Sequence, residues 1–144
     1  MEVSELRQRI LRALDEARKE SALRRSEHDA AKVAYDRFLS QVAIPLFHQA
    51  ATVLRAEGKP FTSQTPLGTV RLAADRPAET FVEIELDLSG PAPRVIGRTS
   101  LPLGGARTVV QEHVIAPGRA IADVTEEAVA QFLAVEIPKL VTRT

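Results

Sequence analysis

The chain has no cysteine and no tryptophan, and aromatic residues make up only 4% of its 144 residues. Without cysteine there can be no disulfide, no thiolate nucleophile and no cysteine-bound zinc. With so few aromatic residues, the core has to be aliphatic, and base stacking is disfavoured as a way of recognising nucleic acid.

An excess of charge of either sign is also missing, since 19 lysines and arginines balance 19 aspartates and glutamates. This balance argues against a strong electrostatic attraction to DNA, RNA or an anionic membrane. No apolar run reaches roughly 18 residues, so no transmembrane helix is predicted. The first residues, Met1 to Glu5, carry two acids and lack the apolar segment of a signal peptide, so we expect a cytoplasmic protein.

Glycine is absent between Val3 and Glu57, and Pro45 is the only proline in that stretch, whereas both residues recur every few positions afterwards. This contrast predicts a helical arm over residues 1–57 and a β-rich body over residues 58–144. Pro45 lacks an N–H and should kink the helix near Gln41.

Apolar residues recur at helical spacing in two stretches of the arm, one before and one after a polar middle, which predicts an apolar side that needs a partner surface. The predicted interaction positions, which we call the seam, are Leu6, Ile10, Leu14, Ala17, Ala31, Tyr35, Phe38 and Val42.

The middle of the seam is polar, with Ser21, Arg24 and His28 at its heptad positions. In one interpretation the helix continues through this region; in the other it breaks near residues 24–29 and Ser26 caps a second helix. We favour the continuous helix because Lys19 to Asp29 contains no glycine, proline or asparagine to make a turn.

The body shows short alternating runs separated by glycine and proline, which is typical of an antiparallel meander of four to six strands. Thr125 then caps a final helix whose apolar face should pack on the sheet. The predicted fold class is therefore α+β. Strands are predicted at 61–65, 68–74, 80–88, 94–101 and 107–115, with a short one at 119–122 and a hairpin tip at Gly104 and Gly105.

Charged residues alternate with apolar ones on the central predicted strands, which indicates a polar sheet face. The face either binds a basic partner or a cation, or it is an ordinary solvated face with cross-strand ion pairs, and we favour the second interpretation. Its predicted members are Glu83, Glu85, Asp87, Arg94, Arg98 and Glu112.

No pattern of catalytic residues is recognisable, so we predict no catalytic residue, no metal site and no cofactor. His28, His48 and His113 do not share the four-residue spacing of a zinc pair. Gly104 and Gly105 are too short a glycine run for a phosphate-binding loop.

The leading hypothesis is a non-enzymatic assembly or adaptor protein that acts through protein–protein contacts of the arm. A homo-oligomer, most simply a dimer, is expected, although a helix of another protein would fit the same stripe. One alternative is a nucleic-acid-binding accessory protein that uses arginines of the arm or the strand with Arg94 and Arg98. Another is a small enzyme or ligand-binding domain with a pocket near Glu85, Glu112 and His113.

Overall fold

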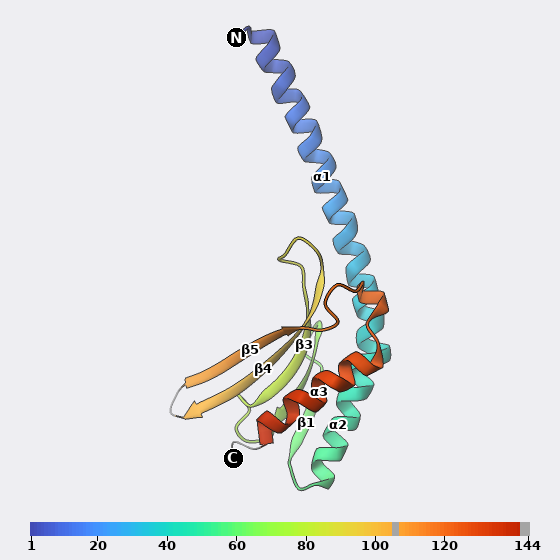
Figure 1. Ribbon diagram of the computed structural model, residues 1–144, viewed down its shortest axis with the longest axis vertical. Helices are drawn as coiled ribbons and strands as arrows, with labels where there is room; N and C mark the ends of the chain where they lie inside the picture. The colour runs from blue at the N-terminus through green and yellow to red at the C-terminus, as the bar shows by residue number, and fades with distance from the viewer. Residues whose placement is uncertain (105–106, 142–144) are drawn as a thin grey trace.

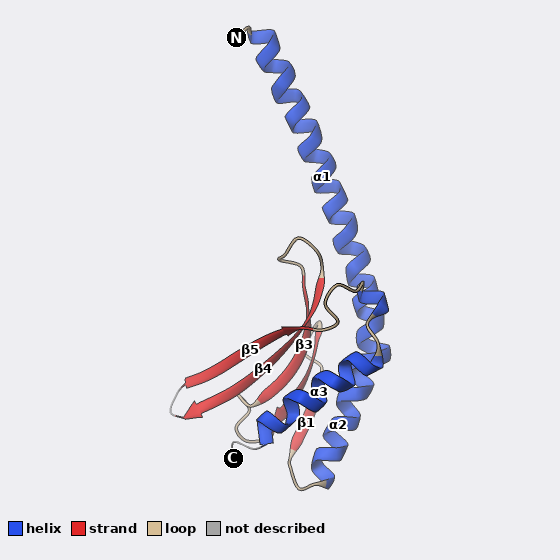
Figure 2. Ribbon diagram, viewed as in Figure 1, coloured by secondary structure: helices blue, strands red, loops and turns tan. Residues whose placement is uncertain are grey.

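The computed structural model describes residues 1–104 and 107–141, and it has the predicted α+β architecture (Figures 1 and 2). A long helical segment is followed by a five-stranded antiparallel sheet and a final helix. In chain order the elements are α1 (Val3–Phe38), η1 (Leu39–Ala43), α2 (Ile44–Ala56), β1 (Phe61–Gln64), β2 (Thr69–Ala74), β3 (Phe81–Asp87), β4 (Arg94–Gly104), β5 (Arg107–Val114), η2 (Ile121–Asp123) and α3 (Glu126–Val141).

Helix α1 runs without a break through the polar middle of the seam, as the continuous-helix interpretation predicted. Ser26 therefore starts no second helix. Ser4 is of a residue type that often caps helices, but here the helix already begins at Val3 and Glu2 is its N-cap, without a side-chain cap bond. The Leu6 N–H donates to the Glu2 carbonyl at 3.1 Å, which starts the helix ahead of Ser4.

The predicted irregularity before Pro45 is a π-helical turn, η1, in which the Ile44 N–H donates to the Leu39 carbonyl. Pro45 has no N–H to donate to the carbonyl four residues earlier, and a local change in winding accommodates that loss. Helix α2 then stops at Gly58, which has a φ of +78°. Lys59 N donates to the Leu54 carbonyl at 2.8 Å, closing the helix end as a Schellman-type cap.

The five strands pair in sequence order, β1-β2-β3-β4-β5, so the sheet is a simple meander. Strand β4 is longer than predicted and includes Pro102. Since β3 begins at Phe81, which pairs with Ser100, only β5 lies beside β4 beyond that point. A proline there removes no β3–β4 hydrogen bond. Of the predicted hairpin tip, Gly104 ends β4, and Gly105 lies outside the described residues.

The short strand predicted at residues 119–122 is wrong, because the chain forms the 3-10 turn η2 at this point. Ile121 and Val124 are both buried, and their spacing of three residues matches one 3-10 turn. The predicted cap of α3 is confirmed, since Thr125 Oγ1 accepts a hydrogen bond from the Ala128 N–H at 3.2 Å.

The core lies between one face of the sheet and the helices. Val70, Leu72, Val82 and Ile84 on the central strands are fully buried, as is Phe47 of α2. Helix α3 packs against Gly97 of β4, where the Phe132 ring occupies the space that a Cβ would need. The helices therefore cover one face, while the first part of α1 extends far beyond the body (Figure 1).

Candidate functional site: the free arm and its seam

The structure divides the predicted seam into a free half and a half that belongs to the core. Leu6, Ile10 and Leu14 are 48%, 49% and 46% exposed, and residues 1–27 are exposed throughout. At about 1.5 Å per residue, the segment from Val3 to Glu27 is roughly 37 Å long. We call this segment the free arm.

The second half of the seam anchors α1 to its own body. Ala31, Tyr35 and Phe38 are buried, and Val42 is partly buried. The Tyr35 hydroxyl donates towards the Gly68 carbonyl at 2.8 Å and lies 3.3 Å from the Ile84 carbonyl. Burial, followed by the nearby carboxylates of Glu85, Asp36 and Glu83, raises the pKa of Tyr35 above its ordinary value. The tyrosine therefore stays a neutral donor that ties the base of the arm to the sheet.

The two halves of the seam lie on the same side of the helix. Ile10 and Tyr35 are 25 residues apart, which is about seven turns at 3.6 residues per turn. The side of α1 that packs on the sheet thus continues outward as the exposed stripe of Leu6, Ile10 and Leu14. Ala17, also a predicted seam residue, extends this stripe towards the body and is exposed.

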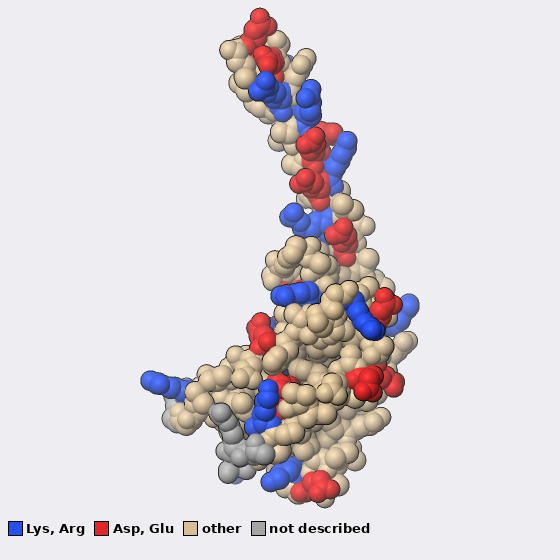
Figure 3. All heavy atoms as spheres, in the orientation of Figure 1, with Lys and Arg blue, Asp and Glu red and all other residues tan. Residues whose placement is uncertain are grey.

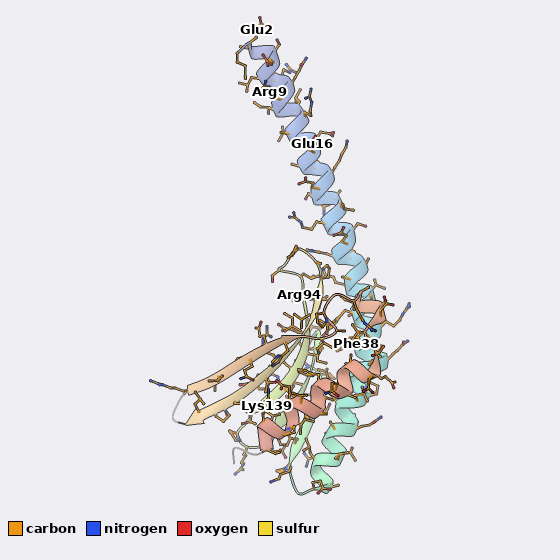
Figure 4. The ribbon with its side chains drawn as sticks, viewed as in Figure 1. Glu2, Arg9, Glu16, Phe38, Arg94 and Lys139 are labelled. Atoms are coloured by element: carbon orange, nitrogen blue, oxygen red, sulfur yellow. The ribbon has the colours of Figure 1, made fainter. Side chains whose placement is uncertain are left out.

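Charges of both signs are interleaved along the free arm (Figure 3). Arg9 pairs with Glu5 at 3.0 Å and Lys19 with Asp15 at 3.1 Å, both one helical turn apart. Figure 4 shows Glu2, Arg9 and Glu16 on the arm well away from the body. Between Met1 and Glu27, six acidic residues offset seven lysines and arginines, which does not favour a phosphate backbone as the partner of the arm.

A groove of about 610 Å³ lies where the free arm meets the body, between α1 and the loop that connects β3 with β4. Its walls combine apolar and charged side chains. The lining residues are Glu20, Leu23, Arg24, Glu27, His28, Leu88, Ser89, Gly90, Pro91 and Pro93.

Charged side chains on the predicted polar sheet face form a row across four strands, which we call the charged row. Register places Arg71 beside Glu83, Glu83 beside Arg98, and Arg98 beside Glu112. The corresponding ion-pair distances are 2.7, 3.5 and 3.0 Å. Arg98 also contacts Glu85.

This row is internally neutralised and partly shielded from solvent. Glu83 is only 5% exposed, so the centre of the face is less solvated than in the solvated, ion-paired face that we favoured from the sequence. The reason is that Arg71 and Arg98 both reach over it. Hydrogen bonding to Glu85 and then to Glu112 outweighs burial and raises the pKa of Arg98.

The remaining pair on this face, Asp87 and Arg94, closes the turn at the end of β3. Their closest atoms, Asp87 Oδ2 and Arg94 Nη2, are 2.6 Å apart. Hydrogen bonds from the Ser89 hydroxyl, from Arg94 and from the Ser89 N–H lower the pKa of Asp87 to about 2. Each predicted acid of the face therefore has an arginine partner, and the arrangement offers no unpaired charge pattern for a basic ligand.

A carboxylate that sequence reasoning missed lies between α3 and the sheet. Glu136 is 1% exposed. Thr99 Oγ1 donates to its Oε1 at 2.9 Å, His113 Nε2 lies 3.0 Å from the same oxygen, and Lys139 Nζ lies 2.6 Å from Oε2. We call these four residues the Glu136 cluster.

The charge of Glu136 is stabilised by these neighbours. Burial alone would raise the pKa of Glu136, but the hydrogen bonds from Lys139 and Thr99 and the charges of Lys139 and His113 lower it overall. The sequence did hold a signal, since Val129, Leu133, Glu136 and Leu140 share one buried helical stripe. A carboxylate at a core position of an amphipathic helix indicates a buried partner.

The ligand pocket that we considered from the sequence would need Glu85, Glu112 and His113 together, but the structure separates His113 from the two glutamates. His113 belongs to the Glu136 cluster beside a cavity of about 240 Å³, whereas Glu112 and Glu85 are held by Arg98 on the charged row. The three side chains therefore make no common site. Among residues 1–104 and 107–141, no group of three or more histidines, aspartates or glutamates is arranged to hold a metal ion.

Comparison with known proteins adds no relative, because the chain matches no family model, no curated protein and no solved structure. No helix in the described part of the chain is both long enough and apolar enough to cross a membrane. The feature with the clearest functional content is therefore the free arm with its exposed apolar stripe.

Proposed function

We propose that this protein is a non-enzymatic assembly protein that associates through its free arm, most simply with a second copy of itself. The observation that supports this proposal best is that both halves of the seam lie on one side of a single helix. The same side of α1 that buries Tyr35 and Phe38 in the body leaves Leu6, Ile10 and Leu14 half exposed beyond it. A long helix with an apolar stripe and no neighbour is the usual form of one half of a helix pair.

Energetics favour a covered arm over an isolated one. In proteins, most of the stability of a helix comes from packing of its amphipathic face, and the free arm lacks this contribution while its stripe is uncovered. Covering the exposed half of a leucine or isoleucine contributes roughly 1 kcal/mol. Six such side chains in a symmetric pair supply on the order of 6 kcal/mol before the entropic cost of association, so a reversible dimer of moderate affinity is expected.

The other polar features suit structural roles. The charged row pairs its own acids with its own arginines, and the Glu136 cluster joins α3 to the sheet with a buried carboxylate. The residues of the charged row include no nucleophile, and the Thr99 hydroxyl beside Glu136 is fully buried, so it is not presented to a substrate. Both features support the body that carries the arm.

Charge introduced on the stripe tests the proposal. The double variant Ile10→Asp, Leu14→Asp should abolish self-association measured by light scattering, because two carboxylates would have to be buried in each arm. Leu23→Asp is the matched control, since Leu23 is 61% exposed and lies about 140° around the helix from Ile10. Equal dimerisation of the wild type and the double variant would refute the proposed role of the stripe.

A further inference from the structure

We propose that the body also binds a small apolar carboxylate, of the kind represented by a medium-chain fatty acid, in a cavity at one end of the sheet. The cavity has a volume of about 220 Å³. Its walls come from the loop after α2, from four strands and their turns, and from the end of α3. The site is therefore a property of the body and is independent of the free arm.

The inner wall of the cavity is apolar and well buried. Phe61 of β1 and Ala74 of β2 are register partners, so their side chains lie on the same face of the sheet. Leu101 of β4 and Leu140 of α3 complete this wall, and each of the four residues is at most 9% exposed. A dry apolar cavity of about 150 Å³ accommodates benzene, so this one has room for a chain of about six to eight carbons.

One side-chain hydroxyl lies among the lining residues, that of Thr80 at the start of β3. Thr80 is only 5% exposed. Its N–H donates to the Pro77 carbonyl at 3.1 Å, and its carbonyl accepts from the Ala74 N–H at 2.9 Å. These bonds fix the residue where a hydroxyl can donate to a ligand with little competition from water.

Both charged residues that line the cavity are cations. Lys59 and Arg76 are exposed, which puts their charged ends at the mouth. Within residues 1–104 and 107–141, neither forms an ion pair. The nearby carboxylate of Asp75 is already engaged, since Arg55 lies 3.2 Å from it and the Thr62 hydroxyl donates to it at 2.7 Å.

This combination identifies the chemistry of the ligand. An enclosed apolar wall takes a hydrocarbon chain or ring, and a few polar groups at the edge fix its orientation. A guanidinium and an ammonium at the mouth fit a carboxylate, which arginine can bind through two parallel hydrogen bonds. The carbonyl end of α3 carries a partial negative charge, so the carboxylate should lie beside Lys59 and Arg76, away from Leu140.

Isothermal titration of the full chain with octanoate tests the site. We expect saturable binding of one octanoate per chain, with a dissociation constant on the order of 0.1 mM. Octylamine has the same chain with the opposite charge and should bind at least about tenfold more weakly. Acetate, which has the carboxylate without the chain, should give no measurable binding.

Substitutions at the mouth assign the binding to this cavity. Arg76→Gln and Lys59→Gln should each raise the dissociation constant for octanoate about threefold to tenfold, because each removes one cation from the carboxylate. Both residues are exposed, so both variants should fold normally. Arg119→Gln is the matched control, since it removes an exposed arginine that is not among the residues lining the cavity.

A substitution in the wall tests the apolar part. Ala74→Val adds two methyl groups to the cavity and should weaken octanoate binding by about fivefold or more. Circular dichroism checks that this variant is folded, and the variants at the mouth decide the question if it is not.

The proposal would be overturned if the wild type did not bind octanoate, or if octylamine bound equally well. Equal binding by Arg76→Gln, Lys59→Gln and Arg119→Gln would also overturn it, because the octanoate would then bind elsewhere. None of these results bears on association through the free arm, which is measured without octanoate.

Discussion

Single residues determine how α3 lies on the sheet, and Glu136 and Gly97 act at the same contact. Gly97 and Thr99 are on one face of β4, where the first accommodates the Phe132 ring and the second donates to Glu136. The contact between α3 and β4 therefore combines apolar packing of Phe132 with a hydrogen bond to the buried carboxylate of Glu136. Each can be tested by a single substitution.

Replacing Glu136 with glutamine should lower the free energy of unfolding by about 2 kcal/mol near neutral pH, because hydrogen bonds to a buried charge are lost. The pKa of Glu136 in the folded protein is below its ordinary value of 4.5. Its contribution is therefore present above that value and is lost as the pH falls through the lower, folded-state pKa. Urea unfolding of both proteins between about pH 7 and pH 3 should show the difference shrinking once the pH falls below 4.5.

The matched control is Glu127→Gln, which changes an exposed carboxylate of the same helix. It should shift stability by no more than about 0.5 kcal/mol. His113 and Lys139 face Glu136 in both the wild type and the Glu136→Gln variant. A difference between these two proteins that stayed constant over the whole pH range would contradict the ionised state assigned to Glu136.

Gly97→Ala should destabilise the protein by about 1 to 3 kcal/mol, because the added methyl group overlaps the Phe132 ring and forces α3 away from the sheet. Thermal unfolding followed by circular dichroism measures the loss. Gly90→Ala is the control, since only the Ala92 carbonyl lies near the place of its Cβ, at 3.9 Å. Equal melting temperatures for the wild type and Gly97→Ala would show that the contact between Phe132 and β4 is looser than described.

At the scale of elements, α1 combines two environments in one continuous helix. Its apolar period and the lack of glycine predict the helix and the identity of its stripe. They do not predict that the stripe is buried from Ala31 onward and exposed before Ser26, because that division depends on where the sheet packs. The neutrality of the charged row, with Glu83 between Arg71 and Arg98, likewise depends on strand register.

The free arm should show concentration-dependent protection of its backbone amides from hydrogen exchange. At micromolar concentrations, amides between Leu6 and Ala17 should exchange quickly, because an uncovered helix opens readily. At concentrations that favour the dimer, their exchange should slow by about tenfold or more, while amides of β3 and β4 stay unchanged. Mass spectrometry of peptides from both regions measures this, and equal exchange of the arm at all concentrations would contradict a covered state.

At the scale of the whole molecule, a compact body carries the free arm, whose apolar stripe is exposed. The α+β class, the meander and the helix packed on the sheet were all predictable from element spacing and turn residues. Glu136 and the groove beside the β3–β4 loop were not, since both arise where segments distant in sequence meet. The free arm needs both kinds of information, because the stripe can be predicted from the sequence, whereas its exposure is seen only in the fold.

Sedimentation equilibrium of the full chain tests the central claim most directly, together with a chain that lacks residues 1–25. The full chain, of 15.7 kDa, should approach twice that mass at roughly 50 to 100 micromolar. The shortened chain should sediment as a monomer and keep its cooperative unfolding, since residues 1–27 are exposed throughout. A full chain that remains a monomer at every concentration would contradict the account.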